Sequence, residues 1–119
     1  GAVSLTVIPS SGPAPLNGVS LRASVGDPAG WKYYYYFFCN SPNAPAVPPG
    51  GSNPPFSNNG SELATSSTTA NYSNCNYPSA GTYTGRTAVL KYQGSDPFST
   101  GAWFVSSNWR QATKTVTVQ

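Results

Sequence analysis

The segment from Trp31 to Cys39 constrains the fold most, because it is aromatic on both of the faces that a β-strand presents. Side chains in a strand point alternately to its two sides. A strand with one solvent-facing side should therefore alternate apolar and polar residues. Here both alternating sets are aromatic, and only Lys32 is polar. One face can line a core, whereas the other needs a cover. This need points toward assembly rather than catalysis.

The rest of the chain predicts an all-β protein. Gly, Pro, Ser, Thr and Asn make up more than half of its 119 residues, and these types favour turns and strands over helices. This length suits one domain, residues 1–119, with one core. Besides the aromatic segment, strands are predicted over residues 3–7, 19–25, 62–69, 71–77, 82–92 and 113–118. We therefore expect a two-sheet sandwich of about seven strands with two long loops, 40–60 and 94–108.

The charged residues argue against several classes of function. The net charge is +3, and the six basic residues are scattered rather than gathered into the stripe that nucleic acid requires. No apolar run is long enough to insert into a membrane. The three carboxylates are dispersed and no His is present, so we predict no enzyme, cofactor or metal site. Asp27 and Asp96 each precede a proline, where a backbone-capping role is expected. A glycosidase with two carboxylates and a calcium site are the less favoured alternatives.

Cys39 and Cys75 are the only cysteines. In a chain this rich in small polar residues they suggest a disulfide and a secreted protein, and two buried free thiols are the alternative. Without His, zinc and a Cys–His nucleophile are disfavoured. The chain starts at Gly1, and we favour a processed natural chain over a trimmed recombinant module.

Three motifs resemble the polycystic-kidney-disease (PKD) repeat family. The segment 77–84, Tyr-Pro-Ser-Ala-Gly-Thr-Tyr-Thr, is similar to the signature at the corner that enters strand F of that family. Residues 9–16 resemble its opening and residues 115–118 its last strand. The resemblance covers most of the chain outside the two long loops. It implies an Ig-like sandwich of two sheets.

The chain departs from the commonest PKD pattern in strand C. The usual Trp-Asp-Phe-Gly-Asp-Gly is replaced by residues 35–40, Tyr-Tyr-Phe-Phe-Cys-Asn. Together with Cys75-Asn76-Tyr77, this resembles a disulfide-bearing subgroup. The resemblance therefore implies a bridge between Cys39 and Cys75.

The second aromatic face is the predicted interface. The PKD resemblance places Tyr83, Thr87 and Val89 inward on strand F, beside strand C. The predicted interface residues are Tyr34, Tyr36, Phe38, Ala88, Leu90 and Tyr92, with Trp103 and Trp109 as anchors on loops that reach adjacent subunits. A neighbouring subunit, the chain's own loops or a stacked glycan are the three possible covers. If a subunit covers this face, lysine at positions 36 and 90 should abolish assembly and leave the fold intact.

We therefore expect an extracellular structural subunit. It should associate with other copies of the same chain, or with neighbouring surface domains, in a filament, tube or layer. The alternative is a carbohydrate-binding or adhesion module that stacks sugars on Tyr34, Tyr36, Trp103 or Trp109. Asn59 and Asn71 each begin an Asn-x-Ser sequon and are candidate glycosylation sites if the source glycosylates.

Overall fold

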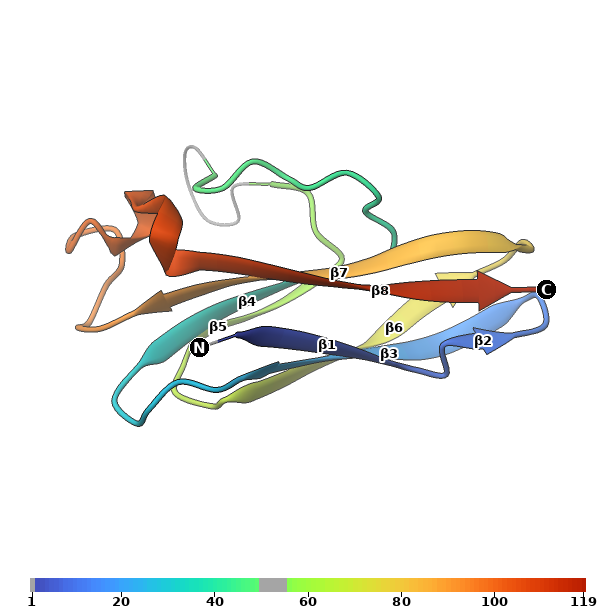
Figure 1. Cartoon of the computed structure of the whole chain (residues 1–119), viewed down its shortest axis with the longest axis horizontal. Helices are drawn as coiled ribbons and strands as arrows, with labels where there is room; N and C mark the ends of the chain where they lie inside the picture. The colour runs from blue at the N-terminus through green and yellow to red at the C-terminus, as the bar shows by residue number, and fades with distance from the viewer. Residues whose placement is uncertain (1, 50–55) are drawn as a thin grey trace.

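The structure is a computed structural model that describes residues 2–49 and 56–119. Within these ranges the chain forms two β-sheets (Figure 1). One has the strand order β1-β3-β6, and the other has the order β2-β8-β7-β4-β5. The strands are β1 (Val3–Ile8), β2 (Ser11–Gly12), β3 (Leu16–Val25), β4 (Lys32–Phe38), β5 (Gly60–Thr65), β6 (Thr69–Tyr77), β7 (Gly81–Tyr92) and β8 (Trp109–Val118). The prediction of an all-β, two-sheet sandwich is confirmed.

Two short 3₁₀-helices, η1 (Ala102–Phe104) and η2 (Ser106–Asn108), are the only helical elements in the described ranges. No helix there has the length and apolar character needed to cross a membrane.

The main core lies between the two sheets and follows the two-residue period of the strands. Leu5 and Val7 of β1 face it, as do Val19, Leu21 and Ala23 of β3. The residues between them on β3 are polar and lie on the outer side, as their alternation predicts. The three-stranded sheet therefore has one buried and one wet face.

The aromatic strand β4 is buried on both sides. Tyr33, Tyr35 and Phe37 enter the main core. The alternate residues Tyr36 and Phe38 belong to a second buried cluster on the other face of the five-stranded sheet. Strand β4 runs between β7 and β5, so backbone hydrogen bonding is satisfied on both of its edges. Burial on both faces explains why nearly every position of the strand is apolar.

Strands β3 and β8 begin earlier than predicted, at Leu16 and Trp109, and two further departures from the predicted strands have local reasons. The polar stretch 62–69 is divided between β5 and β6 by a turn at Ser67, whose hydroxyl donates to the backbone oxygen of Thr69 at 2.7 Å. The region after β1, which reads as a break because of its prolines, holds the short strand β2, parallel to β8. The chain thus passes from one sheet to the other between β1 and β2.

Cys39 and Cys75 form a disulfide that joins the end of β4 to β6, and so links the two sheets. Their Cα atoms are 5.5 Å apart and their sequence separation is 36. The bridge that the PKD resemblance implies is therefore present.

Removing the disulfide should lower the free energy of unfolding by roughly 3–4 kcal/mol, because the unfolded chain regains the freedom of a long loop. Urea denaturation of the oxidised protein and of a Cys39→Ser/Cys75→Ser variant measures this difference. Intact mass with and without reductant gives an independent check, since reduction adds two hydrogens. Unfolding midpoints that coincide would contradict the prediction.

Candidate functional site

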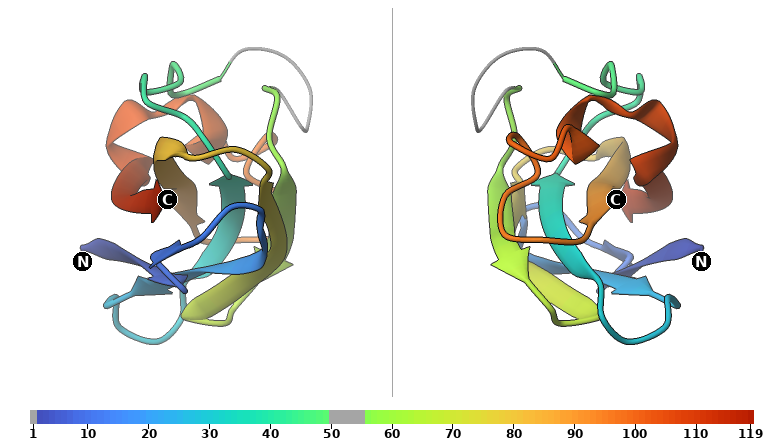
Figure 2. Two further views of the ribbon diagram at one scale, coloured as in Figure 1. Left: turned by 90° about the vertical axis from the view of Figure 1, so that its right-hand side faces the viewer. Right: turned by 90° about the vertical axis from the view of Figure 1, so that its left-hand side faces the viewer.

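The outer face of the five-stranded sheet carries a second core, called here the outer cluster. Its buried members are Tyr36, Phe38, Ala88, Leu90, Tyr92, Trp103 and Trp109. Val47, Phe56 and Phe98, from the two long loops, pack against it. Figure 2 shows that the described parts of both loops lie on the side of this sheet that faces away from the three-stranded sheet. The cover of the second aromatic face thus comes from the chain itself.

The tryptophans hold the two loops to this face. Trp103, on η1, donates its indole N–H to the backbone oxygen of Pro49 at 3.0 Å. Trp109, at the start of β8, donates to the backbone oxygen of Trp103 at 2.9 Å. The rings of Phe98 and Trp103 are stacked with centroids 4.5 Å apart. Each buried indole therefore satisfies its polar N–H while its ring fills the cluster.

This arrangement corrects the predicted interface. All the predicted residues except the half-buried Tyr34 are buried, and Trp103 is 0 % exposed. They are not available to a neighbouring subunit, nor can Tyr36, Trp103 or Trp109 serve as sugar-stacking platforms. The apolar residues within the loops, Val47 and Phe56 among them, were the sequence signal for an intrachain cover.

The tyrosines of this region are held in their neutral form. Burial raises the pKa of Tyr34 and of Tyr36, and the negative charge of Asp96 adds to the rise at Tyr34. Their hydroxyls therefore remain protonated near neutral pH, which suits packing rather than acid–base chemistry.

A buried charge cluster centred on Asp27 lies near one end of the sandwich. Its carboxylate is 1 % exposed and accepts two hydrogen bonds from the Arg110 guanidinium, at 2.9 and 3.2 Å. The Tyr33 hydroxyl donates to it at 3.0 Å, and the Lys91 ammonium lies 3.6 Å away. The expected turn-capping role of Asp27 is therefore replaced by a long-range one. Asp96 does cap its own turn, accepting from the N–H of Phe98 at 2.9 Å.

The pKa of Asp27 reflects two opposing effects. Burial raises it, but several hydrogen bonds to the carboxylate, those from Arg110 and Tyr33 among them, and the charge of Arg110 outweigh burial and lower it below its usual value. Burial, together with the hydrogen bond to Asp27, raises the pKa of Tyr33 to about 12. The carboxylate thus stays ionised at neutral pH as part of the packing of β4, β7 and β8.

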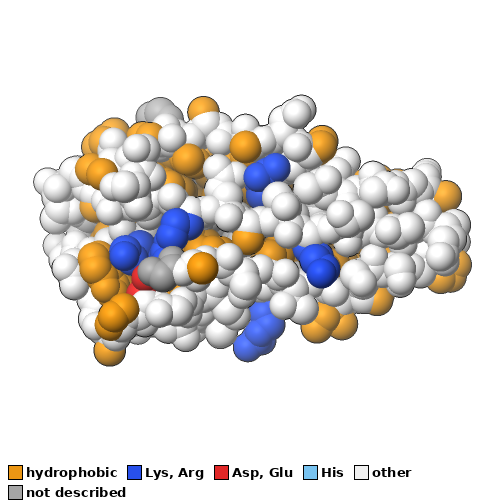
Figure 3. All heavy atoms as spheres, in the orientation of Figure 1, with side chains coloured by type: hydrophobic (Ala, Val, Ile, Leu, Met, Phe, Trp, Pro, Cys, Tyr) orange, Lys and Arg blue, Asp and Glu red, His pale blue; other side chains and the backbone are white. Residues whose placement is uncertain are grey.

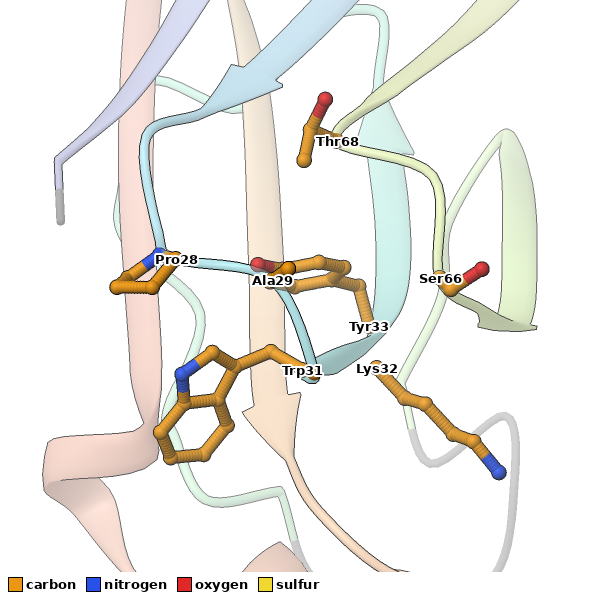
Figure 4. A pocket seen from close by; sticks show the side chains of 8 residues that line it. Pro28, Ala29, Trp31, Lys32, Tyr33, Ser66 and Thr68 are labelled. Atoms are coloured by element: carbon orange, nitrogen blue, oxygen red, sulfur yellow. The ribbon is translucent and has the colours of Figure 1, made fainter.

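A pocket of about 440 Å³ lies at the same end, called here the end pocket. It is lined by residues 28–33, in the turn before β4 and its start, and by Ser66 and Thr68 in the turn between β5 and β6. In Figure 4 Pro28 and Trp31 lie on one side of the Tyr33 ring and Ser66 on the other, and the Lys32 side chain points away from them. The Lys91 ammonium lies 4.2 Å from the centroid of the Trp31 ring. Sequence reasoning missed this pocket, because its two walls are far apart in the chain.

The hydroxyls of Ser66 and Thr68 make no hydrogen bond within the described ranges, so they can donate to a ligand. Figure 3 shows basic side chains dispersed over the face in view and a single acidic spot. Within residues 2–49 and 56–119, no three His, Cys, Asp or Glu residues lie together as a metal site.

Both predicted glycosylation sites are exposed on the same edge of the sandwich. Asn59 accepts from the backbone N–H of Cys39 at 2.6 Å, and Asn71 accepts from the Arg22 guanidinium at 3.4 Å. Gly60 and Tyr72, the central residues of the two sequons, lie against each other. A Cβ atom added to Gly60 would lie only 2.2 Å from the Tyr72 ring. Both asparagines remain candidate acceptors.

No protein-family model matches this chain, and no curated protein sequence matches it.

Proposed function

We propose that the chain is a non-catalytic structural module of an extracellular or cell-surface assembly, such as a filament, tube or layer. We further propose that its sandwich is Ig-like and of the PKD-like kind. The strand topology, the disulfide and the shape of the molecule support these proposals.

The topology supports the Ig-like assignment. In Ig folds one sheet contains strands A, B and E, and the other contains C, F and G. The orders β1-β3-β6 and β8-β7-β4 follow this scheme. Near the start of β7, the Tyr83 hydroxyl donates to the backbone oxygen of Ser79 at 2.6 Å. This contact matches the tyrosine corner of Ig-like sandwiches.

The disulfide supports an oxidising compartment, because such bridges persist in secreted and surface proteins and are rare in reducing ones. The exposed positions of Asn59 and Asn71 are compatible with glycosylation there.

The observation that carries the structural role is the elongated shape of the molecule, whose two ends are formed by different segments of the chain. Its extents are 45 × 28 × 19 Å, with the strands running along the long axis (Figure 1). Strand β8 ends at one pole, beside the β2–β3 turn, and the β3–β4 and β5–β6 turns lie toward the other. Copies placed end to end would therefore continue the strand direction, and a load along the axis would be borne by the backbone hydrogen bonds and the disulfide.

The test is concentration-dependent assembly of the oxidised protein. We expect the sedimentation coefficient to rise with concentration and electron microscopy to show ordered polymers at the highest concentrations. A protein that stays monomeric throughout would contradict the proposal.

The second candidate function is carbohydrate binding, and the end pocket favours it. Ser66 and Thr68 offer hydroxyl groups beside a partly apolar hollow. Retention of the monomer on a polysaccharide column, lost on Ser66→Ala/Thr68→Ala substitution, would support this alternative.

A further inference from the structure

We propose that the end pocket receives the exposed turn Pro13–Ala14–Pro15 of a second copy, so that copies join head to tail. This inference rests on the proposed structural role and adds the contact surfaces and the polarity of the assembly.

The two surfaces lie at opposite poles of the long axis. The end pocket is formed by the β3–β4 and β5–β6 turns at one pole. The proline turn lies between β2 and β3 at the other pole, beside the end of β8 (Figure 1). A translation along the axis brings the turn of one copy toward the pocket of the next.

The proline turn is a rigid projection. Pro13, Ala14 and Pro15 are all exposed. The N–H of Ala14 donates to the backbone oxygen of Gln119 at 2.9 Å, and the N–H of Gln119 donates to that of Gly12 at 2.9 Å. Proline also has little conformational freedom to lose. Docking this turn therefore costs less entropy than docking a mobile loop.

The hydrogen-bonding groups of the two surfaces are complementary. The turn has backbone carbonyls but no spare N–H, because two of its residues are prolines and the N–H of Ala14 is already bonded. The pocket is lined by the hydroxyl donors of Ser66 and Thr68.

The apolar groups and the charges match as well. Pro28, Ala29 and Tyr33 give the pocket an apolar wall, a surface of the kind that docks proline-containing segments. No charged residue lies between Thr6 and Arg22, so the turn brings no charge to repel Lys32.

This geometry predicts an open polymer. The contact joins two different surfaces, and such heterologous contacts extend indefinitely unless a rotation closes them into a ring. An end face within 28 × 19 Å is smaller than the roughly 800 Å² per partner of a standard stable interface. Each contact should therefore be weak, and assembly should depend steeply on concentration.

Two charge insertions test the contact. Ala14→Arg alters the projecting turn and Ala29→Arg obstructs the pocket; both positions are exposed in turns, and urea denaturation checks that each variant folds. Each should weaken self-association at least about tenfold, because an unpaired guanidinium would enter the contact. Thr113→Arg, exposed on β8 away from both poles, is the matched control and should assemble like the wild type.

Mixing the two variants gives the sharper result. The Ala14→Arg copy keeps its pocket and the Ala29→Arg copy keeps its turn, so the mixture should form a one-to-one dimer that cannot grow. Sedimentation velocity distinguishes this dimer from monomers and from polymers.

The outcomes separate this inference from the proposed function. A wild-type protein that never assembles refutes both. If the wild type assembles and either variant assembles equally well, or the mixture polymerises, the head-to-tail contact is wrong and the structural role stands. A saccharide that fills the pocket without affecting assembly would also overturn the contact.

Discussion

Replacing both Tyr36 and Leu90 with lysine is expected to unfold the protein. Both side chains are fully buried in the outer cluster, where the ring of Tyr36 packs 4.9 Å from that of Phe56 and 6.0 Å from that of Trp109. Each lysine would place an unpaired ammonium in this cluster, at a cost of several kcal/mol. Two such costs are comparable with the whole stability of a typical domain, about 5–15 kcal/mol.

Near-UV circular dichroism and urea denaturation measure this effect. Thr113→Lys/Thr115→Lys is the control, because both threonines are exposed on β8 of the same sheet and the pair adds the same charge as the double variant. Tyr36→Ala/Leu90→Ala removes the same packing without adding charge, and so tests whether lost packing or added charge dominates. A double variant with a native spectrum and an unchanged midpoint would show that the loops do not seal this face.

The sequence alone predicted the opposite outcome, an intact fold, and the reason is physical. Alternation along β4 and β7 correctly indicated that both faces are apolar, since strand periodicity is a local property. It carries no information on which segment covers the second face. That depends on the docking of Val47, Phe56 and Phe98, which lie in irregular loops without a period.

The parts of the fold that short motifs encode were predicted best. The segment 77–84 marked the turn before β7, where the Tyr83 hydroxyl bonds four residues back. The motifs around Cys39 and Cys75 likewise implied the bridge. Asp27 shows the limit of such reasoning, because the proline after it favours a local capping role while its partner Arg110 is 83 residues away.

The second large effect is expected at Asp27. Asp27→Asn preserves the shape of the side chain but leaves the Arg110 guanidinium, only 18 % exposed, and the Lys91 ammonium without their carboxylate. Removing one partner of a buried ion pair costs about 3–5 kcal/mol, because the remaining charge is no longer compensated. Glu62→Gln is the matched control: its side chain is exposed and makes no ion pair in the described ranges, so its effect should stay within about 0.5 kcal/mol.

The stability that is lost in Asp27→Asn should also depend on pH, and it should be largest at neutral pH. The folded state lowers the pKa of this carboxyl, so the unfolded chain binds its proton first as the pH falls. The stabilisation is therefore complete above the unfolded pKa of about 3.9 and declines as the pH falls below it toward the folded value. Urea denaturation between pH 7 and pH 2.5 gives the free energy of unfolding of the wild type and of Asp27→Asn. The difference between the two should be large at neutral pH and should decrease below about pH 4. A difference that stays constant across this range, or none at pH 7, would mean that the carboxylate's contacts with Arg110 and Lys91 do not stabilise the fold.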